Sequence, residues 1–178
     1  MVKAGEVVGR PVIVREGGRQ VGKVKDVIVD QAGKQVLGFI ISEGLLKSTK
    51  VASWGALQAL GPDSVILNAA GSVVKAAQAP EIKGVLDKGL SIRGLRLQTT
   101  EGKELGKVED FQFDERTGEV EGYELSGGIL ADAFEGRAFL PTPPSIELGK
   151  DVAFVGPEAE ATVHQSGGIK GAFKRGSD

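Results

Sequence analysis

The residue types that most often carry chemistry are spaced in this chain for structure rather than for catalysis. Residues 17–24 read GGRQVGKV, one residue short of the phosphate-binding pattern G-x-x-x-x-G-K-[ST]. Val24 stands where the Ser or Thr that binds Mg²⁺ would be, and the segment lies between two predicted strands instead of opening a helix. We therefore interpret residues 17–24 as a hairpin, and we predict no nucleotide site.

Two pairs of aspartates, Asp26 with Asp30 and Asp110 with Asp114, have the residue type of an acid–base pair or a hard-metal site. Four positions along a strand correspond to about 13 Å at ~3.3 Å per residue, which is too far for one ion or a dyad. A carboxylate can instead accept backbone N–H groups and so cap a turn or a bulge. We expect no catalytic residue, no metal and no cofactor, and therefore no enzyme.

The chain has no cysteine, which removes disulfides and thiolate catalysis and is typical of a reducing compartment. Its single histidine, His164, is far in sequence from any Ser–Asp arrangement. There is no run of 18 apolar residues and no signal peptide at residues 1–10. These features predict a cytoplasmic protein without a membrane span.

The elements that position these residues come from an internal duplication. Residues 18–42 recur 84 positions later as residues 102–126, with nine of the 25 aligned pairs identical. The duplication predicts two units of roughly 70 residues, which pack on each other or on a partner because units this small are marginal alone. We expect a first barrel at 1–68, a linker at 69–90 with a helical turn interrupted by Pro80, a second barrel at 91–156 and a flexible tail at 157–178.

Each copy reads as short strands separated by turns led by Gly or Asp. Val24 is out of phase with Val27, and Val108 is out of phase with Phe111 in the second copy. A strand changes phase at a bulge or a bend, and a bend repeated in both copies favours closure into a barrel. The fold class is therefore all-β, with two tandem six-stranded β-barrels and short helical turns. The residues expected at turns and bulges are Gly22, Asp26, Asp30, Gly106, Asp110 and Asp114.

The two copies differ in their surfaces. Residues 1–67 contain nine Lys or Arg against six Asp or Glu, whereas residues 92–156 contain seven against thirteen. This asymmetry is explained either by drift of solvated faces or by opposite fields that orient the barrels and select partners. Strand 36–41 is apolar on both faces, whereas its copy carries Glu121 and Glu124, which we expect to be exposed. The first barrel is therefore predicted to be covered on its outside.

Short apolar loops follow each repeated hairpin. Such loops either form exposed tips that bind a partner or cover a neighbouring hydrophobic element. Trp54 is interpreted as a core or inter-barrel anchor, with stacking on a ligand as the alternative. The loop residues proposed for interaction are Leu45, Leu46, Ile129, Leu130 and Phe134.

The order of these features resembles the PRC-barrel superfamily, which includes the photosynthetic reaction-centre H subunit and the C-terminal domain of the ribosome-maturation protein RimM. Residues 22–26 (GKVKD), 106–110 (GKVED) and 61–66 (GPDSVI) carry the resemblance. It implies a small barrel that serves as an interaction or assembly module, without shared catalytic residues. The leading hypothesis is a protein-binding module, with a homodimer as one form. The alternative is an RNA- or ribosome-associated protein, which rests on the family and on Arg10, Arg15, Arg19, Lys23 and Lys25.

Overall fold

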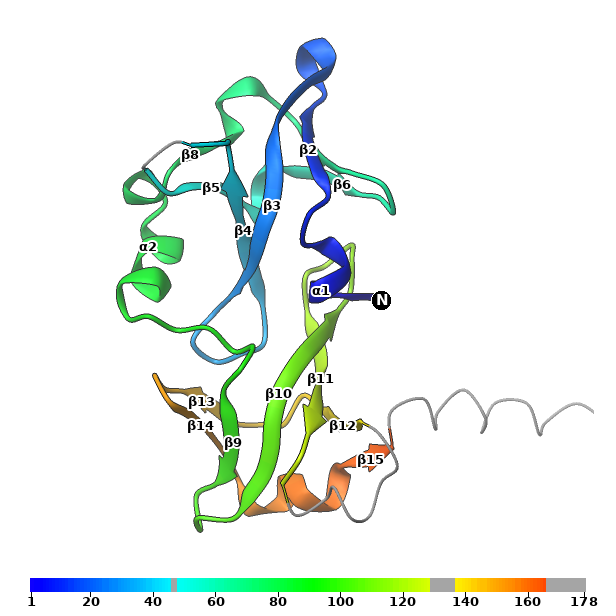
Figure 1. Ribbon diagram of the computed structural model, residues 1–178, viewed down its shortest axis with the longest axis vertical. Helices are drawn as coiled ribbons and strands as arrows, with labels where there is room; N and C mark the ends of the chain where they lie inside the picture. Colours follow the sequence, from blue (N-terminus) through cyan, green and yellow to red (C-terminus); the bar gives the residue numbers. More distant parts are fainter. Residues whose placement is uncertain (46–47, 129–136, 166–178) are drawn as a thin grey trace, which may run out of the picture.

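The computed structural model describes residues 1–45, 48–128 and 137–165, which form two curved sheets stacked along one long axis (Figure 1). The first sheet has the strand order β6-β7-β2-β3-β4-β5-β8 and the second the order β13-β14-β9-β10-β11-β12-β15. Each order is the other with every strand replaced by its copy, which confirms two tandem barrels of the same topology. Strands β2 and β7, like β9 and β14, pair in parallel, and the other neighbours within each order are antiparallel.

The element bounds follow the repeat. The strands of the first unit are β2 (Pro11–Val14), β3 (Arg19–Val29), β4 (Val36–Ser42), β5 (Lys50–Ser53), β6 (Leu57–Leu60), β7 (Val65–Leu67) and β8 (Val74–Lys75). Those of the second are β9 (Arg96–Thr99), β10 (Glu104–Phe113), β11 (Val120–Ser126), β12 (Ala138–Pro141), β13 (Ile146–Leu148), β14 (Val152–Val155) and β15 (His164–Gln165). Strand β1 (Val2–Lys3), helices α1 (Ala4–Val7) and α2 (Pro80–Asp87), and the 3-10 turns η1 (Glu16–Gly18), η2 (Trp54–Ala56), η3 (Ala70–Ser72), η4 (Ala76–Gln78) and η5 (Pro157–Thr162) complete the described chain.

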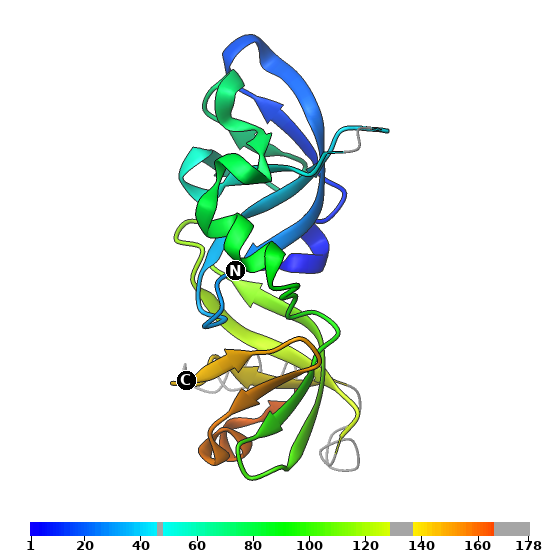
Figure 2. The ribbon, with the colours of Figure 1, turned by 90° about the vertical axis from the view of Figure 1, so that its left-hand side faces the viewer.

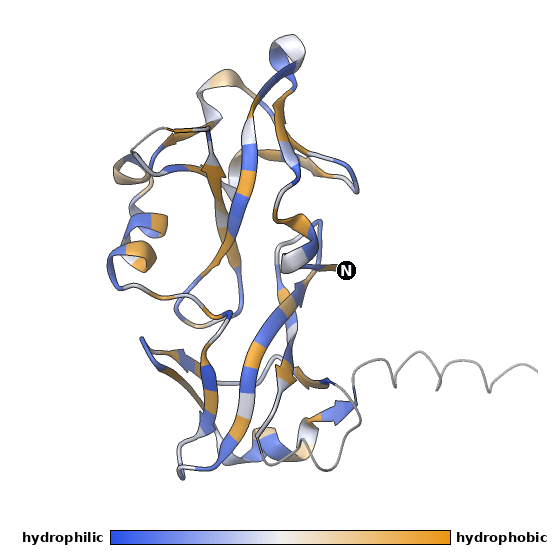
Figure 3. Cartoon of the chain, viewed as in Figure 1, coloured by the Kyte–Doolittle hydropathy of each residue, from blue (hydrophilic) through white to orange (hydrophobic). Residues whose placement is uncertain are grey.

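The long strands β3 and β10 bend at the places where the apolar phase breaks. Against β4, Lys25 is an extra residue of β3 between Val24 and Asp26, and against β11, Glu109 is an extra residue of β10 between Val108 and Asp110. A second bulge lies nearer the start of each strand, at Val21 opposite β2 and at Leu105 opposite β9. A bulge of one residue moves the following side chains to the other face of the strand. Apolar and polar stripes alternate along both strands in Figure 3.

A single cluster of buried apolar side chains runs through both barrels, including Val12 and Phe39 of the first and Phe111 and Leu140 of the second. Trp54 joins them, because its ring lies 6.0 Å from the ring of Phe39 and 6.1 Å, edge-on, from the ring of Phe113. The two small units therefore share one core, and Trp54 is an anchor between them.

The tips of the two hairpins reach into the opposite barrel (Figure 1). The backbone N–H of Val36 donates to the carbonyl of Gly118 at 2.8 Å, and that of Val120 donates to Lys34 at 2.9 Å. In addition, the hydroxyl of Tyr123 donates to the carbonyl of Gly33. The β3–β4 tip is thus built into the second barrel and the β10–β11 tip into the first.

Helix α2 covers the outside of the first barrel, as the apolar pattern of β4 predicts. Ile82 and Val85 on the helix pack against Ile28 and Val51 of the sheet. Pro80 does not interrupt this helix but begins it, which suits a residue whose missing N–H is not needed in the first turn. The linker is therefore part of the first unit's hydrophobic packing.

Two ends of the chain join the second barrel. Strand β1 pairs with β10, opposite Phe113 and Gln112, so residues that begin the first repeat belong to the sheet of the second. At the other end, residues 157–165, expected in a flexible tail, form η5 and β15, and β15 pairs with β12. Among the described residues, no helix is long and apolar enough to cross a bilayer.

Candidate interaction surface

An open groove lies at the end of the first barrel where β3 begins and β4 ends. It has a volume of about 560 Å³ and is lined by residues 20–23 and 42–44, which we call the β3–β4 groove. A second hollow of about 380 Å³ continues from it and shares Gln20, Val21 and Glu43. Together they form a continuous depression with main chain, one partly buried valine and polar side chains at its surface.

The floor of the groove is formed by the bulge at Val21 in β3. Gly22 has φ +151°, and a Cβ there would lie 2.5 Å from the carbonyl oxygen of Ser42. Its copy, Gly106, has φ +147°, with the oxygen of Ser126 at 2.8 Å from the same position. Both conformation and space therefore require glycine, and this allows the backbones of β3 and β4 to approach each other closely.

The same place in the second barrel is filled. Gly127 and Gly128 both have positive φ, at +65° and +72°, which turns the chain back over β10. The Cβ position of Gly128 is only 2.7 Å from the carbonyl oxygen of Leu105, and the Leu105 side chain is fully buried. The main chain of a Gly-Gly step thus closes the groove of the second barrel.

Glu43 explains why the first barrel stays open. In the aligned repeat it occupies the position of Gly127. Gly127 turns the chain back with a positive φ, a conformation that is unfavourable for an L-residue, and Glu43 does not adopt it. The chain turns one residue later at Gly44, where no atom lies within 4 Å of the Cβ position. Val21, the counterpart of Leu105, remains only partly buried. One substitution in the repeat therefore separates a filled groove from an open one.

Leu45 directly follows Gly44, the last of the residues that line the groove, and it is fully exposed, at 102% of the reference area. The loop that carries it projects from the first barrel (Figure 2). Leu45 is one of the residues that the sequence proposes for interaction, and the structure places it beside the groove. The others, Leu46, Ile129, Leu130 and Phe134, lie outside the described residues.

The aspartates proposed as caps accept backbone hydrogen bonds. Asp30 accepts the N–H of Lys34 at 2.8 Å and, more weakly, that of Gln35 at 3.3 Å. Asp114 accepts the N–H groups of Thr117 and Arg116, and these bonds hold the pKa of its carboxyl below the usual value. Both carboxylates therefore stabilise hairpin turns.

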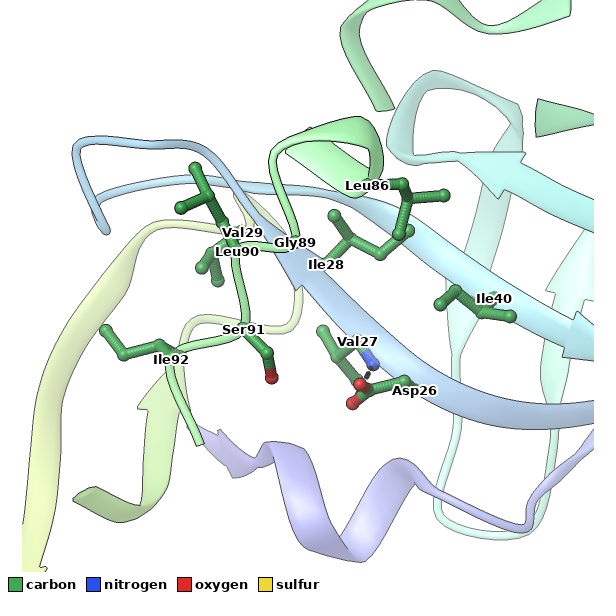
Figure 4. Close-up of a pocket in the computed structure, with 10 residues that line it drawn as sticks. All are labelled: Asp26, Val27, Ile28, Val29, Ile40, Leu86, Gly89, Leu90, Ser91 and Ile92. Carbon is green, nitrogen blue, oxygen red and sulfur yellow. Dashed lines mark hydrogen bonds between the residues drawn. The ribbon is translucent and has the colours of Figure 1, made fainter. Parts of the chain in front are cut away.

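Asp26 and Asp110 each follow a bulge and accept the N–H of the next residue at 2.9 Å. Asp110 is 8% exposed, and the N–H of Gly5 donates to both of its oxygens at 3.1 Å. Asp26 instead borders a cavity of about 240 Å³ between β3 and the segment after α2 (Figure 4). In the second barrel the bulge aspartate holds the start of the chain in place, whereas in the first it faces this small cavity.

Glu124 was expected on the surface, and this is wrong: its side chain is 1% exposed. Lys3 approaches one carboxylate oxygen at 2.6 Å and Arg137 the other at 3.1 Å, while the amide of Gln112 donates at 3.2 Å. Burial acts to raise the pKa of Glu124, and the hydrogen bonds from these three partners outweigh it, so the pKa lies below its usual value. A buried carboxylate is tolerated because it is fully paired.

The signal for this site was present in the repeat, because Glu124 aligns with Ile40. A carboxylate at an apolar position requires a cation nearby, but Lys3 is 121 residues away and its pairing with the second barrel has no local pattern. Within the described residues, no group of three His, Cys, Asp or Glu side chains is arranged to hold a metal ion.

A sequence model of the PRC-barrel domain matches the chain twice, over residues 1–73 and 89–160. A search of curated proteins finds no match to the chain. The two matched ranges cover most of the chain, and each contains one bulged long strand and one Asp-capped hairpin. The chain therefore belongs to the PRC-barrel domain family, of which it carries two copies in tandem.

Proposed function

We propose that this protein is a non-catalytic interaction module whose β3–β4 groove binds an extended segment of a protein partner. The observation that carries the proposal is the difference between the two copies. The groove is closed by main chain in the second barrel and open beside an exposed leucine in the first. A backbone-lined groove with an apolar rim suits a peptide that adds along a strand, a common mode of recognition.

The buried polar residues support a role without chemistry. Asp110 and Glu124 are engaged by partners from other elements, and the hydroxyl of Thr99 accepts the N–H of Lys103. Each of these groups fixes one segment of the chain to another. A cytoplasmic location is part of the proposal and is supported by the absence of cysteine.

Photo-cross-linking from the rim tests the proposal. A photoreactive phenylalanine analogue replaces Leu45 in one variant and Phe154, which is 43% exposed on the second barrel, in the control. We expect a discrete protein adduct from position 45 that is absent from position 154 and is lost when Glu43→Gly is added. Equal adducts from both positions, or none from position 45, would contradict the proposal.

RNA binding is the second proposal, and the exposed cations of the first barrel favour it. Arg15, Arg19, Lys23 and Lys25 are all exposed, and Lys23 lines the groove. Arg10 is less available because its guanidinium donates to the carbonyl of Gly61 at 2.8 Å. This proposal expects retention on RNA that weakens with salt and with neutralisation of Arg19 and Lys23. An absence of retention at low salt would reject it.

A further inference from the structure

The tetrapeptide Ser-Gly-Gly-Ile occurs twice in the chain, at residues 126–129 and at residues 166–169. In the first occurrence, Gly127 and Gly128 supply the main chain that closes the groove of the second barrel. The remaining pair of adjacent glycines, Gly17 and Gly18, belongs to η1. Residues 166–169 thus repeat the segment that fills this kind of groove.

The open groove has the shape that a Gly-Gly step requires. In the second barrel the Cβ position of Gly128 is 2.7 Å from the oxygen of Leu105 and 2.8 Å from the nitrogen of Gly106, so a side chain does not fit there. The floor of the first groove is the same bulge, with Gly22 in nearly the same conformation as Gly106. A groove that excludes side chains selects for glycine in whatever fills it.

Residues 166–169 cannot reach the groove of their own chain. They follow Gln165, which ends β15 in the second barrel, whereas the groove is at the far end of the first (Figure 1). Four extended residues span at most about 14 Å, whereas the six steps of β3 from Lys23 at the groove to Val29 already cover about 20 Å within the first barrel. The segment therefore has to enter the groove of a second molecule.

We propose that the β3–β4 groove of one copy binds residues 166–169 of a second copy. The inference deepens the proposed function, on which it rests, by naming the segment that is bound. Glu43 and Leu45 at the rim supply a carboxylate for Lys170, the next residue, and an apolar surface for Ile169. Because the groove and the segment are different surfaces, the contact is head to tail. A dimer formed in this way still has one empty groove and one unbound segment, so further copies can add.

Two complementary variants of the full chain test this arrangement. Glu43→Gly restores the Ser-Gly-Gly sequence after β4, so that the first groove closes on itself as the second does. Gly168→Val adds a side chain to the bound segment and leaves the groove intact. In sedimentation velocity over a concentration series, we expect the unaltered chain to associate. Each variant alone should associate with a dissociation constant at least about tenfold higher. An equimolar mixture of the two variants should form a one-to-one dimer and nothing larger, because only one groove and one segment remain functional.

Matched substitutions serve as controls. Glu43→Gln keeps the groove open and removes only the charge proposed to face Lys170, so it should weaken association less than Glu43→Gly does. Gly176→Val makes the same change as Gly168→Val outside the tetrapeptide and should associate like the unaltered chain. A synthetic peptide of residues 163–172 should dissociate the assembly, whereas the same peptide with valine at position 168 should not. Circular dichroism of Glu43→Gly verifies that the fold is unchanged.

The inference is overturned if the unaltered chain stays monomeric, if either variant associates like it, or if the mixture forms no dimer. The cross-linking experiment separates this result from failure of the proposed function. A partner adduct at position 45 that Glu43→Gly abolishes would leave the groove as a binding site for another protein's segment. Loss of both results would remove the groove as an interaction surface.

Discussion

Gln35 pairs with Glu119 in an isolated antiparallel bridge, and the two residues are copies of each other at the 84-residue offset of the repeat. A residue that pairs with its own copy lies on a local two-fold axis, as in the self-complementary interface of a homodimer. The flanking bonds obey the same symmetry, with Val36 donating to Gly118 and Val120 donating to Lys34. The two barrels are therefore joined as an intramolecular dimer through exchanged hairpin tips.

Gly118 should be far less tolerant of alanine than a glycine of similar conformation in open space. At φ +75° its Cβ would lie 2.6 Å from Nε2 of Gln35 and 2.9 Å from the ring of Trp54. At Gly102, φ is +86° and nothing lies within 4 Å of the Cβ position. We expect Gly102→Ala to cost about 1–2 kcal/mol for the backbone alone. Gly118→Ala should cost a further ~1–3 kcal/mol for overpacking, measured by urea unfolding. Equal costs would show that the tip does not pack tightly against the first barrel.

The two barrels should unfold in one transition, because they share a core and exchange hairpin tips. Trp54 is the chain's one tryptophan and contacts Phe39 of the first barrel and Phe113 of the second. Its fluorescence therefore reports the junction, whereas circular dichroism in the far ultraviolet reports all strands. We expect the two urea curves to coincide, which is the test of two-state behaviour. A fluorescence change that precedes the loss of strand signal would mean that the barrels separate first.

Tyr123, the chain's one tyrosine, should ionise only when the protein unfolds. Burial, and next the charge of Asp30, raise the pKa of its hydroxyl, which donates to the carbonyl of Gly33. Because the pKa is higher in the folded than in the unfolded protein, the protonated hydroxyl stabilises the fold fully below the unfolded-state pKa near 10. This stabilisation is lost as the pH rises above that value. We expect phenolate absorbance to appear together with the loss of strand signal at alkaline pH. A reversible titration of the folded protein near pH 10 would contradict the buried hydrogen bond.

Replacing Tyr123 with phenylalanine isolates the hydroxyl. The change leaves the buried carbonyl of Gly33 without its donor, and such an unsatisfied group costs about 1–3 kcal/mol of unfolding free energy. Because this bond joins the two barrels, the variant should also expose the β3–β4 tip to faster amide exchange. An unchanged midpoint in urea would show that the bond adds no stability.

Glu124 should make the second barrel sensitive to acid. Its pKa is lower in the folded than in the unfolded protein. Its contribution to the free energy of unfolding is therefore complete above the unfolded-state pKa near 4.3 and is lost as the pH falls through the folded-state pKa. We expect Glu124→Gln to cost ~1–3 kcal/mol at neutral pH and to unfold with a weaker pH dependence below about pH 5. Glu121→Gln, at an exposed position on the same strand, is the control and should behave like the unaltered protein. Parallel pH curves for all three proteins would contradict a role for the buried carboxylate.

The local features of the fold are the ones that the sequence predicts well. The phase breaks predict bends in β3 and β10, and the structure has bulges there at Lys25 and Glu109. The apolar pattern of β4 predicts an outer cover, and α2 supplies it. These predictions succeed because side-chain alternation and the conformational freedom of glycine act over a few neighbouring residues.

The candidate groove was only partly predictable. The sequence proposes Leu45 for interaction, in a loop that either forms an exposed tip or covers a neighbouring element, but it does not show that the adjoining bulge is uncovered. That depends on whether the chain after β4 turns back over β3, which Gly127 and Gly128 allow in the second barrel and Glu43 does not in the first. The difference is visible in the aligned copies once the structure shows what Gly128 contacts.

The sequence by itself determined two barrels of the PRC type, their bulges and their capped hairpins, because each depends on short-range backbone preferences that occur twice. Only the tertiary structure decided how the copies join. It placed β1 on the second sheet, buried Glu124 beside Lys3 and Arg137, and paired Gln35 with Glu119. These contacts join residues 13 to 121 positions apart, and most of them depend on the packing of one barrel against the other, which no periodicity within a single strand encodes.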